Sequence, residues 1–151
     1  MKPRFLLVAL ALGALVAAGC GDDGPDATGG TSGAPTCTVP GTEPATFGEG
    51  LLPASVPARF PLPEGAVVGS TLLDRANHRT EAALTVRQES PVVVQYYTVS
   101  LVSAGYVVDS SAGDPLVRWR IEFSRGDLRG SIDLQSGGSG VTAFVVTFNT
   151  C

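Results

Sequence analysis

Two neighbouring segments with a strict alternation of apolar and polar residues constrain the fold of this chain most strongly. Residues 116–124 and 128–135 both repeat with the period of two that is typical of a strand with one buried face. The apolar positions are Val117, Trp119, Ile121 and Phe123 in the first segment and Leu128, Gly130, Ile132 and Leu134 in the second. A tight turn around Arg125-Gly126 joins them, because glycine adopts the positive φ that such turns need. These residues predict an antiparallel hairpin with a buried apolar face.

The turn also predicts a register for this hairpin. Pairing of Ser124 with Asp127 would place apolar residues opposite each other on one face and opposite charges on the other, which stabilises neighbouring strands. The resulting pairs are Phe123–Leu128, Trp119–Ile132, Val117–Leu134, Glu122–Arg129 and Arg118–Asp133. Gly130 would then lie opposite Ile121 and leave room for Trp119.

Residues 91–104 predict a helix. Ser90 is a good N-cap, Pro91 suits the first helical position and Gly105 suits the position after the C-cap. The stripe that would face the core consists of Val93, Val94, Tyr97, Leu101 and Ala104. Several β-branched residues lower the helix propensity of this segment, so a strand remains the alternative.

Further strands are expected at residues 66–73, 80–87, 106–111 and 141–150. The sequence therefore predicts an α+β fold with a single antiparallel sheet of about five to six strands, one helix packed across one face, and the order ββαβββ. This small domain is expected to span residues 46–151. Within it, the proline-rich residues 47–63 are expected to form an irregular strap. Residues 20–45, rich in Gly, Ser, Thr and Pro, are expected to be a flexible linker.

The first twenty residues have the features of an export signal. Lys2 and Arg4 precede an apolar run at residues 5–18, which is shorter than the roughly 20 residues that span a bilayer. The segment Ala17-Ala18-Gly19-Cys20 follows and resembles the lipobox of bacterial lipoprotein precursors, although that family prefers Leu where Ala17 stands. The resemblance implies that residues 1–19 are a signal peptide and that Cys20 receives a diacylglyceryl lipid. An ordinary signal peptide cut near Ala18 is the alternative.

The resemblance also implies a location. A lipidated Cys20 would anchor the chain to the cell membrane or the outer membrane, on its extracytoplasmic side, through fatty-acyl chains such as palmitate. Removal of the signal peptide leaves eight Arg, no Lys and fourteen acids, so the formal charge of the mature chain becomes −6. We do not expect an acidic exported chain to bind nucleic acid.

Cys37 and Cys151 remain if Cys20 is lipidated. An even pair of cysteines in an exported chain predicts a disulfide bond. In the chain-entropy model, a bond that closes so long a loop contributes up to about 4–5 kcal/mol. Free thiols or intermolecular bonds remain the alternatives.

The sequence predicts no catalytic, cofactor or metal site. His78 is the single histidine and stands in a polar loop without a G-x-S-x-G motif elsewhere. Asp22, Asp23 and Asp26 lie in the linker, where a flexible chain makes a weak metal site. The acids considered as a glycosidase pair are Asp109, Asp114, Glu122 and Asp127. We therefore expect a protein that is not an enzyme.

Two features suggest an interaction. Arg125-Gly126-Asp127 resembles the integrin-binding tripeptide and stands at a hairpin tip, although the turn alone explains its glycine. Val92, Tyr96 and Val99 form a second apolar stripe on the expected helix, away from the core stripe. Either the strap covers this stripe or a partner does.

Together these features predict a membrane-tethered exported lipoprotein with a non-enzymatic binding domain. Its partner would be an envelope protein or a small ligand, in addition to the membrane that holds Cys20. An accessory or structural subunit of an envelope complex is the alternative, and an envelope hydrolase is a weaker one.

Overall fold

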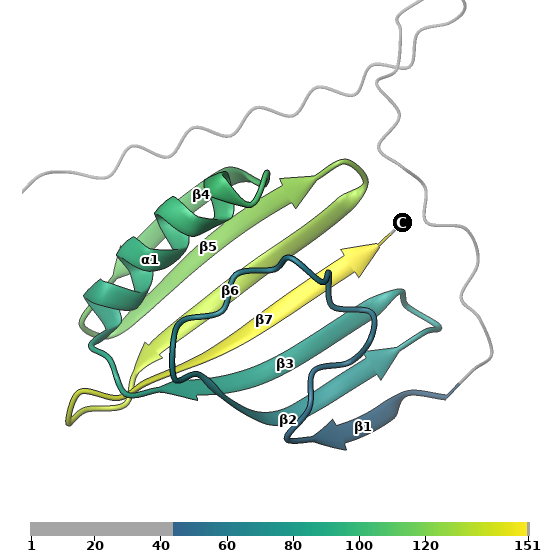
Figure 1. Cartoon of the computed structure of the whole chain (residues 1–151), viewed down its shortest axis with the longest axis horizontal. Helices are drawn as coiled ribbons and strands as arrows, with labels where there is room; N and C mark the ends of the chain where they lie inside the picture. The colour runs from purple at the N-terminus through teal and green to yellow at the C-terminus, as the bar shows by residue number, and fades with distance from the viewer. Residues whose placement is uncertain (1–43, 151) are drawn as a thin grey trace, which may run out of the picture. The chain divides into compact units, whose positions relative to one another are not determined.

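Seven strands of the computed structural model form one antiparallel sheet, and one helix of the described chain lies across it (Figure 1). The structure describes residues 44–150. The elements are β1 (Thr46–Glu49), β2 (Val67–Asp74), β3 (Arg79–Val86), α1 (Ser90–Ser103), β4 (Val107–Asp114), β5 (Arg118–Arg125), β6 (Leu128–Ser136) and β7 (Thr142–Thr150). The strand order is β1-β2-β3-β7-β6-β5-β4, so α1 carries the chain from the middle of the sheet to its far edge.

The predicted α+β fold with a single antiparallel sheet and one helix is confirmed, whereas the predicted number of five to six strands is wrong. The strand that was not expected is β1, which pairs with β2. All four of its residues are exposed, so the sequence carries no alternation that would mark it. Only the backbone pairing with β2 makes this segment a strand.

Local signals explain the C-terminal end of α1, whereas at its N-terminal end only Pro91, which lies in the first turn, acts as expected. Gly105 has a φ of 85°, and the N–H of Tyr106 donates to the Leu101 carbonyl at 3.0 Å, which is the Schellman arrangement. The prediction of Ser90 as the N-cap is wrong, because Glu89 holds that position without a side-chain hydrogen bond. The hydroxyl of Ser90 is buried in the first turn and has no hydrogen-bond partner among residues 44–150.

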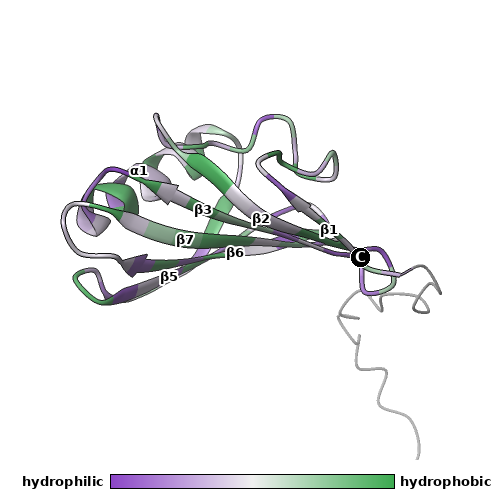
Figure 2. Ribbon diagram, turned by 90° about the horizontal axis from the view of Figure 1, so that it is seen from below, coloured by the Kyte–Doolittle hydropathy of each residue, from purple (hydrophilic) through white to green (hydrophobic). Residues whose placement is uncertain are grey.

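Helix α1 and the strap, now defined as residues 50–66, cover the same face of the sheet. Figure 1 shows α1 over the side of the sheet that holds β4 and β5, with the strap beside it over β7, β3 and β2. Phe60 anchors the strap, because its ring centroid lies 4.9 Å from that of Phe148, 5.6 Å from Phe123 and 6.1 Å from Tyr97. Phe60 therefore joins β7, β5 and α1 in one core. Hydrophobic stretches of β7 and α1 are green in Figure 2.

The hairpin of β5 and β6 forms as predicted, but its predicted register is wrong by two residues. Arg125 pairs with Leu128, so the turn consists of Gly126 and Asp127, with Gly126 at a φ of 58°. A glycine with positive φ at the first central position is typical of a type II′ hairpin turn. The observed pairs on the inner face are Trp119–Leu134, Ile121–Ile132 and Phe123–Gly130. A shift of two residues keeps the side chains of β5 and β6 on their predicted faces, because the period of a strand is two. Val117, predicted to face the core, instead lies in the turn before β5 and is 62% exposed.

Gly130 favours the observed register. A Cβ atom at this position would lie 2.3 Å from Cζ of Phe123 and 2.8 Å from the carbonyl oxygen of Thr147. The missing side chain therefore makes room for the ring of Phe123, and not for Trp119 as the sequence had suggested. Trp119 is half-buried, and its indole N–H donates to the Ser111 hydroxyl at 2.8 Å.

Two adjacent tyrosines on α1 provide a matched test of this packing. The hydroxyl of Tyr96 donates to the carbonyl of Leu62 in the strap at 2.7 Å. The hydroxyl of Tyr97 is buried without a partner among the described residues, and burial raises its pKa. A satisfied hydrogen bond contributes about 1 kcal/mol, whereas loss of an unsatisfied buried polar atom is neutral or stabilising.

We therefore expect Tyr96→Phe to lower the free energy of unfolding by about 1 kcal/mol and Tyr97→Phe to leave it unchanged or raise it. Urea titrations of the two variants beside the parent chain measure both changes. A larger loss for Tyr97→Phe than for Tyr96→Phe would contradict the contact between α1 and the strap.

Candidate functional site

The sheet face opposite α1 and the strap has no element over it within residues 44–150. Its side chains are the outward members of the same alternations that build the core, since successive residues of a strand point to opposite faces. Antiparallel sheets commonly keep one such face in water. We call it the open face, and it carries the candidate site.

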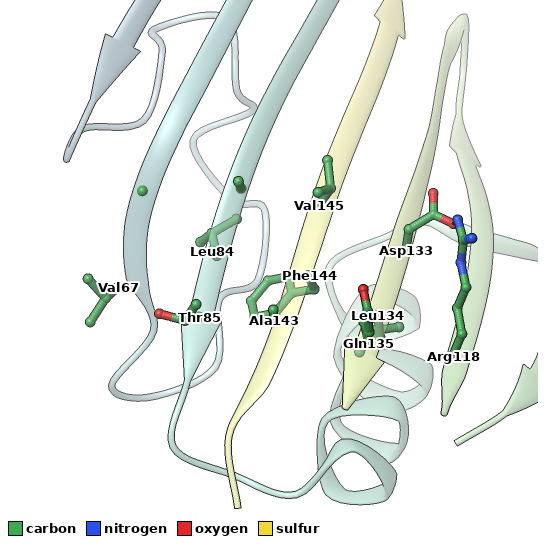
Figure 3. A pocket seen from close by; sticks show the side chains of 12 residues that line it. Val67, Leu84, Thr85, Arg118, Asp133, Leu134, Gln135, Ala143, Phe144 and Val145 are labelled. Carbon is green, nitrogen blue, oxygen red and sulfur yellow. The ribbon is translucent and has the colours of Figure 1, made fainter. Parts of the chain in front are cut away.

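A hollow of about 380 Å³ lies on one end of the open face (Figure 3). The outward residues that line it are Val67, Gly69, Ala83, Thr85, Arg118, Asp133, Gln135, Ala143 and Val145. Ala83 and Val145 are opposite each other on β3 and β7, as are Thr85 and Ala143. Small side chains at neighbouring positions explain why the surface is hollowed here. The result is a shallow apolar floor with charged and amide groups on one side.

The charged side of the hollow is an ion-pair cluster. Arg120 lies opposite Asp133 in the sheet and donates to both of its carboxylate oxygens, at 2.9 and 3.2 Å. Arg118 donates to the same carboxylate at 3.2 Å, which retains the predicted pairing of Arg118 with Asp133. The other predicted pair is not formed, because Glu122 binds Arg120 at 3.2 Å and lies opposite Ser131 rather than Arg129.

Arg118 is the cluster member most available to a ligand. Its side chain is 71% exposed, compared with 51% for Arg120 and 22% for Asp133. Arg120 is shared between Asp133 and Glu122, whereas Arg118 makes a single bond to Asp133, which leaves most of the Arg118 guanidinium donors free to bind an anion. Figure 3 shows Arg118 and Asp133 reaching toward each other at the edge of the hollow.

A second surface, the α1 groove, contains all three residues of the predicted interaction patch. Val92, Tyr96 and Val99 line a shallow groove of about 660 Å³ along α1, together with Gln95, Ser100, Ser103 and Ala104. The strap reaches Tyr96 through Leu62 but leaves Val92 and Val99 exposed by 52% and 62%. The strap therefore covers the patch only in part.

The structure places His78 in the turn between β2 and β3. The turn is organised by Asp74, whose carboxylate accepts from the backbone N–H of Asn77 at 3.1 Å and from its side-chain amide at 2.6 Å. These hydrogen bonds lower the pKa of Asp74. His78 is exposed, with a φ of 51°. His78 is therefore an exposed turn residue with a left-handed backbone conformation.

Three of the four acids considered for carbohydrate chemistry have separate local partners, and the fourth, Asp127, lies in the β5–β6 turn. Asp109 accepts from the Ser124 hydroxyl at 3.0 Å, Glu122 accepts from the Ser110 hydroxyl at 3.0 Å, and Asp114 accepts from the Leu116 N–H at 2.9 Å. Within residues 44–150, no three His, Cys, Asp or Glu side chains are grouped as metal ligands. The positions Asp22, Asp23, Asp26, Cys20, Cys37 and Cys151 lie outside the described residues.

The tripeptide Arg125-Gly126-Asp127 is part of the β5–β6 turn. The guanidinium carbon of Arg125 lies 4.4 Å from the centroid of the Tyr106 ring, a cation–π contact. Burial raises the pKa of the Tyr106 hydroxyl, and the charge of Arg125 opposes this shift. Arg129 donates to the carbonyl of Gly126 at 2.8 Å. Contacts within the domain therefore account for Arg125 and Gly126.

No family model matches the chain, and comparisons with curated proteins and with solved structures found no significant match. No helix in the part of the chain that the structure describes is long and apolar enough to cross a bilayer.

The sequence contained a signal for the hollow in the apolar residues at its outward strand positions. Outward positions of a half-buried sheet are usually polar, yet Ala83, Ala143 and Val145 occupy them on two adjacent central strands. Only the pairing of β3 with β7, which are far apart in the sequence, brings these residues together.

Proposed function

We propose that this chain is an exported, membrane-tethered lipoprotein and that its domain is a non-enzymatic binding module. The lipobox-like segment that ends at Cys20 supports the tether, and the hollow on the open face is the observation that carries the binding role. The class of ligand that fits best is a small molecule with an apolar body and an anionic group. Its body would lie on Ala83 and Ala143, and its charge would lie near Arg118.

The position of the hollow suits this proposal. The described chain enters the sheet at Thr46, which pairs with Leu73 at the far end of β2 from Val67. The hollow lies toward the Val67 end, and six residues of strand, roughly 20 Å, separate Val67 from the point where the chain enters. A tether at the N-terminal side would therefore leave the hollow accessible.

The tether is tested by metabolic labelling with an alkyne-tagged fatty acid in a bacterial host. We expect the parent chain to carry the label and to fractionate with membranes, whereas Cys20→Ala loses both properties. Cys37→Ala is the matched control and should retain them. A labelled Cys20→Ala variant, or an unlabelled parent chain, would contradict the tether.

The binding role is tested by titrating the protein with octanoate, which has a carboxylate and an apolar tail, while amide and methyl shifts are followed by NMR. We expect shifts centred on Ala83, Ala143 and Val145, and binding about fivefold weaker in Arg118→Gln, equivalent to about 1 kcal/mol. Arg59→Gln removes an exposed arginine of the strap and should change nothing. Shifts confined to α1, or equal affinity in both variants, would contradict the proposed site.

An accessory subunit of an envelope complex is the second candidate, and the α1 groove is the observation that favours it. Exposed valines on a helix without charged residues are typical of a surface that contacts another protein. Purification from native membranes with a partner in fixed stoichiometry, lost in Val99→Glu, would favour this candidate over the free ligand binder.

A further inference from the structure

Strand β4 is a free edge of the sheet and is as long as its neighbour β5. It pairs with β5 on one side only and spans eight residues, twice the length of the opposite edge strand β1. Natural proteins block such edges with charged side chains, especially Lys, and with Pro, short strands or bulges. Residues 107–114 contain neither Lys nor Pro, and their two acids, Asp109 and Asp114, flank the segment Ser110–Gly113. Beyond the bulge between Val108 and Ser110, residues 110–114 pair one to one with β5, with Gly113 at a φ of 139°.

The hairpin geometry shows which backbone groups of β4 face outward. Arg125 and Leu128 flank a two-residue turn and therefore form a hydrogen-bonded pair, and such pairs alternate along an antiparallel ladder. Arg120 and Glu122 consequently direct their backbone groups toward β4, where they lie opposite Ala112 and Ser110. It follows that Ser111 and Gly113 direct their N–H and C=O groups away from the sheet.

This edge is complementary to itself. Antiparallel pairing of two copies about Ala112 places Ser111 of each copy opposite Gly113 of the other, so that both outward backbone groups are satisfied. The side chains along the seam are small, and Asp114 lies opposite Ser110 of the second copy rather than opposite another acid. A foreign peptide would gain its specificity from side-chain pockets beside the edge, and Ser110–Gly113 offers only small side chains.

The uncharged helix beside this edge lowers the electrostatic repulsion between two copies that meet there. The mature chain would carry a formal charge of −6, so two copies repel each other over most of their surface. Residues Ser90–Ser103 contain no charged side chain, and Val99 and Val102 are exposed by 62% and 60%. A two-fold axis perpendicular to the sheet would keep both copies of α1 on the same face, so uncharged surfaces flank the seam.

We propose that two copies of this chain pair through β4, antiparallel and centred on Ala112, to form one continuous sheet. This inference does not depend on the ligand of the open face, because it uses the backbone edge and not the hollow.

The test is a disulfide across the axis in the full mature chain. In the proposed register, Ala112 of one copy forms a non-hydrogen-bonded pair with Ala112 of the other, with Cα atoms about 4.5 Å apart, which suits a disulfide. Ser110 is exposed on the same face of β4, but its two copies would be roughly 13 Å apart along the strands. Ser110→Cys is therefore the matched control for Ala112→Cys.

We expect oxidised Ala112→Cys to give, after trypsin digestion without reduction, a disulfide-linked pair of identical peptides 88–118, and Ser110→Cys to give at least about tenfold less. The parent chain should sediment as a dimer. Sedimentation as a monomer at all concentrations, which an extended peptide as the true occupant would produce, would overturn the proposal. Equal cross-linking of the two variants would overturn the register and the proposal with it.

Discussion

The whole structure depends on how the inner face of a wide sheet is covered. Seven strands spaced about 4.8 Å apart make a surface roughly 29 Å across, whereas a helix with its side chains is about 10 Å wide. Helix α1 therefore cannot cover the inner face alone. The strap completes the cover, and Phe60 links the two parts by packing against rings from β5, β7 and α1. The prolines that prevent regular structure in the strap are compatible with this role, because the strap supplies side chains rather than a ladder.

Helix α1 and the strap cover one face of the sheet, whereas the opposite face and the β4 edge have no element over them within residues 44–150. The two proposed interactions use these two surfaces. The hollow exists because outward positions of β3 and β7 hold small residues beside the exposed Arg118. The free edge exists because α1 crosses from β3 to β4 and the chain then returns strand by strand to β7. A ligand on the open face and a second copy at β4 would use different surfaces, so the two interactions are compatible.

The sequence predicts the parts of this fold that depend on local chemistry. Alternation assigned the side chains of β5 and β6 to their correct faces, although it wrongly placed Val117 in the core, and Gly105 marked the end of α1. The register was wrong by two residues because both candidate turns contain Gly126, and the choice depends on the fit between Gly130 and Phe123. β1 could not be predicted because its residues are all exposed and show no alternation. The apolar outward residues of β3 and β7 were visible in the sequence, but only pairing between these distant segments brings them together as a hollow. The lipidation and disulfide predictions concern cysteines outside the described residues.

The central claim is that Phe60 closes the core, and its removal tests that claim most directly. Replacement of a buried Phe by Ala typically costs about 3–5 kcal/mol. We predict a loss of that size for Phe60→Ala in urea unfolding, with faster amide exchange in β2, β3 and β7, which lie under the strap. Phe47→Ala is the control, because Phe47 is 79% exposed on β1. If Phe60→Ala costs no more than Phe47→Ala, the strap is not part of the core and the account is wrong.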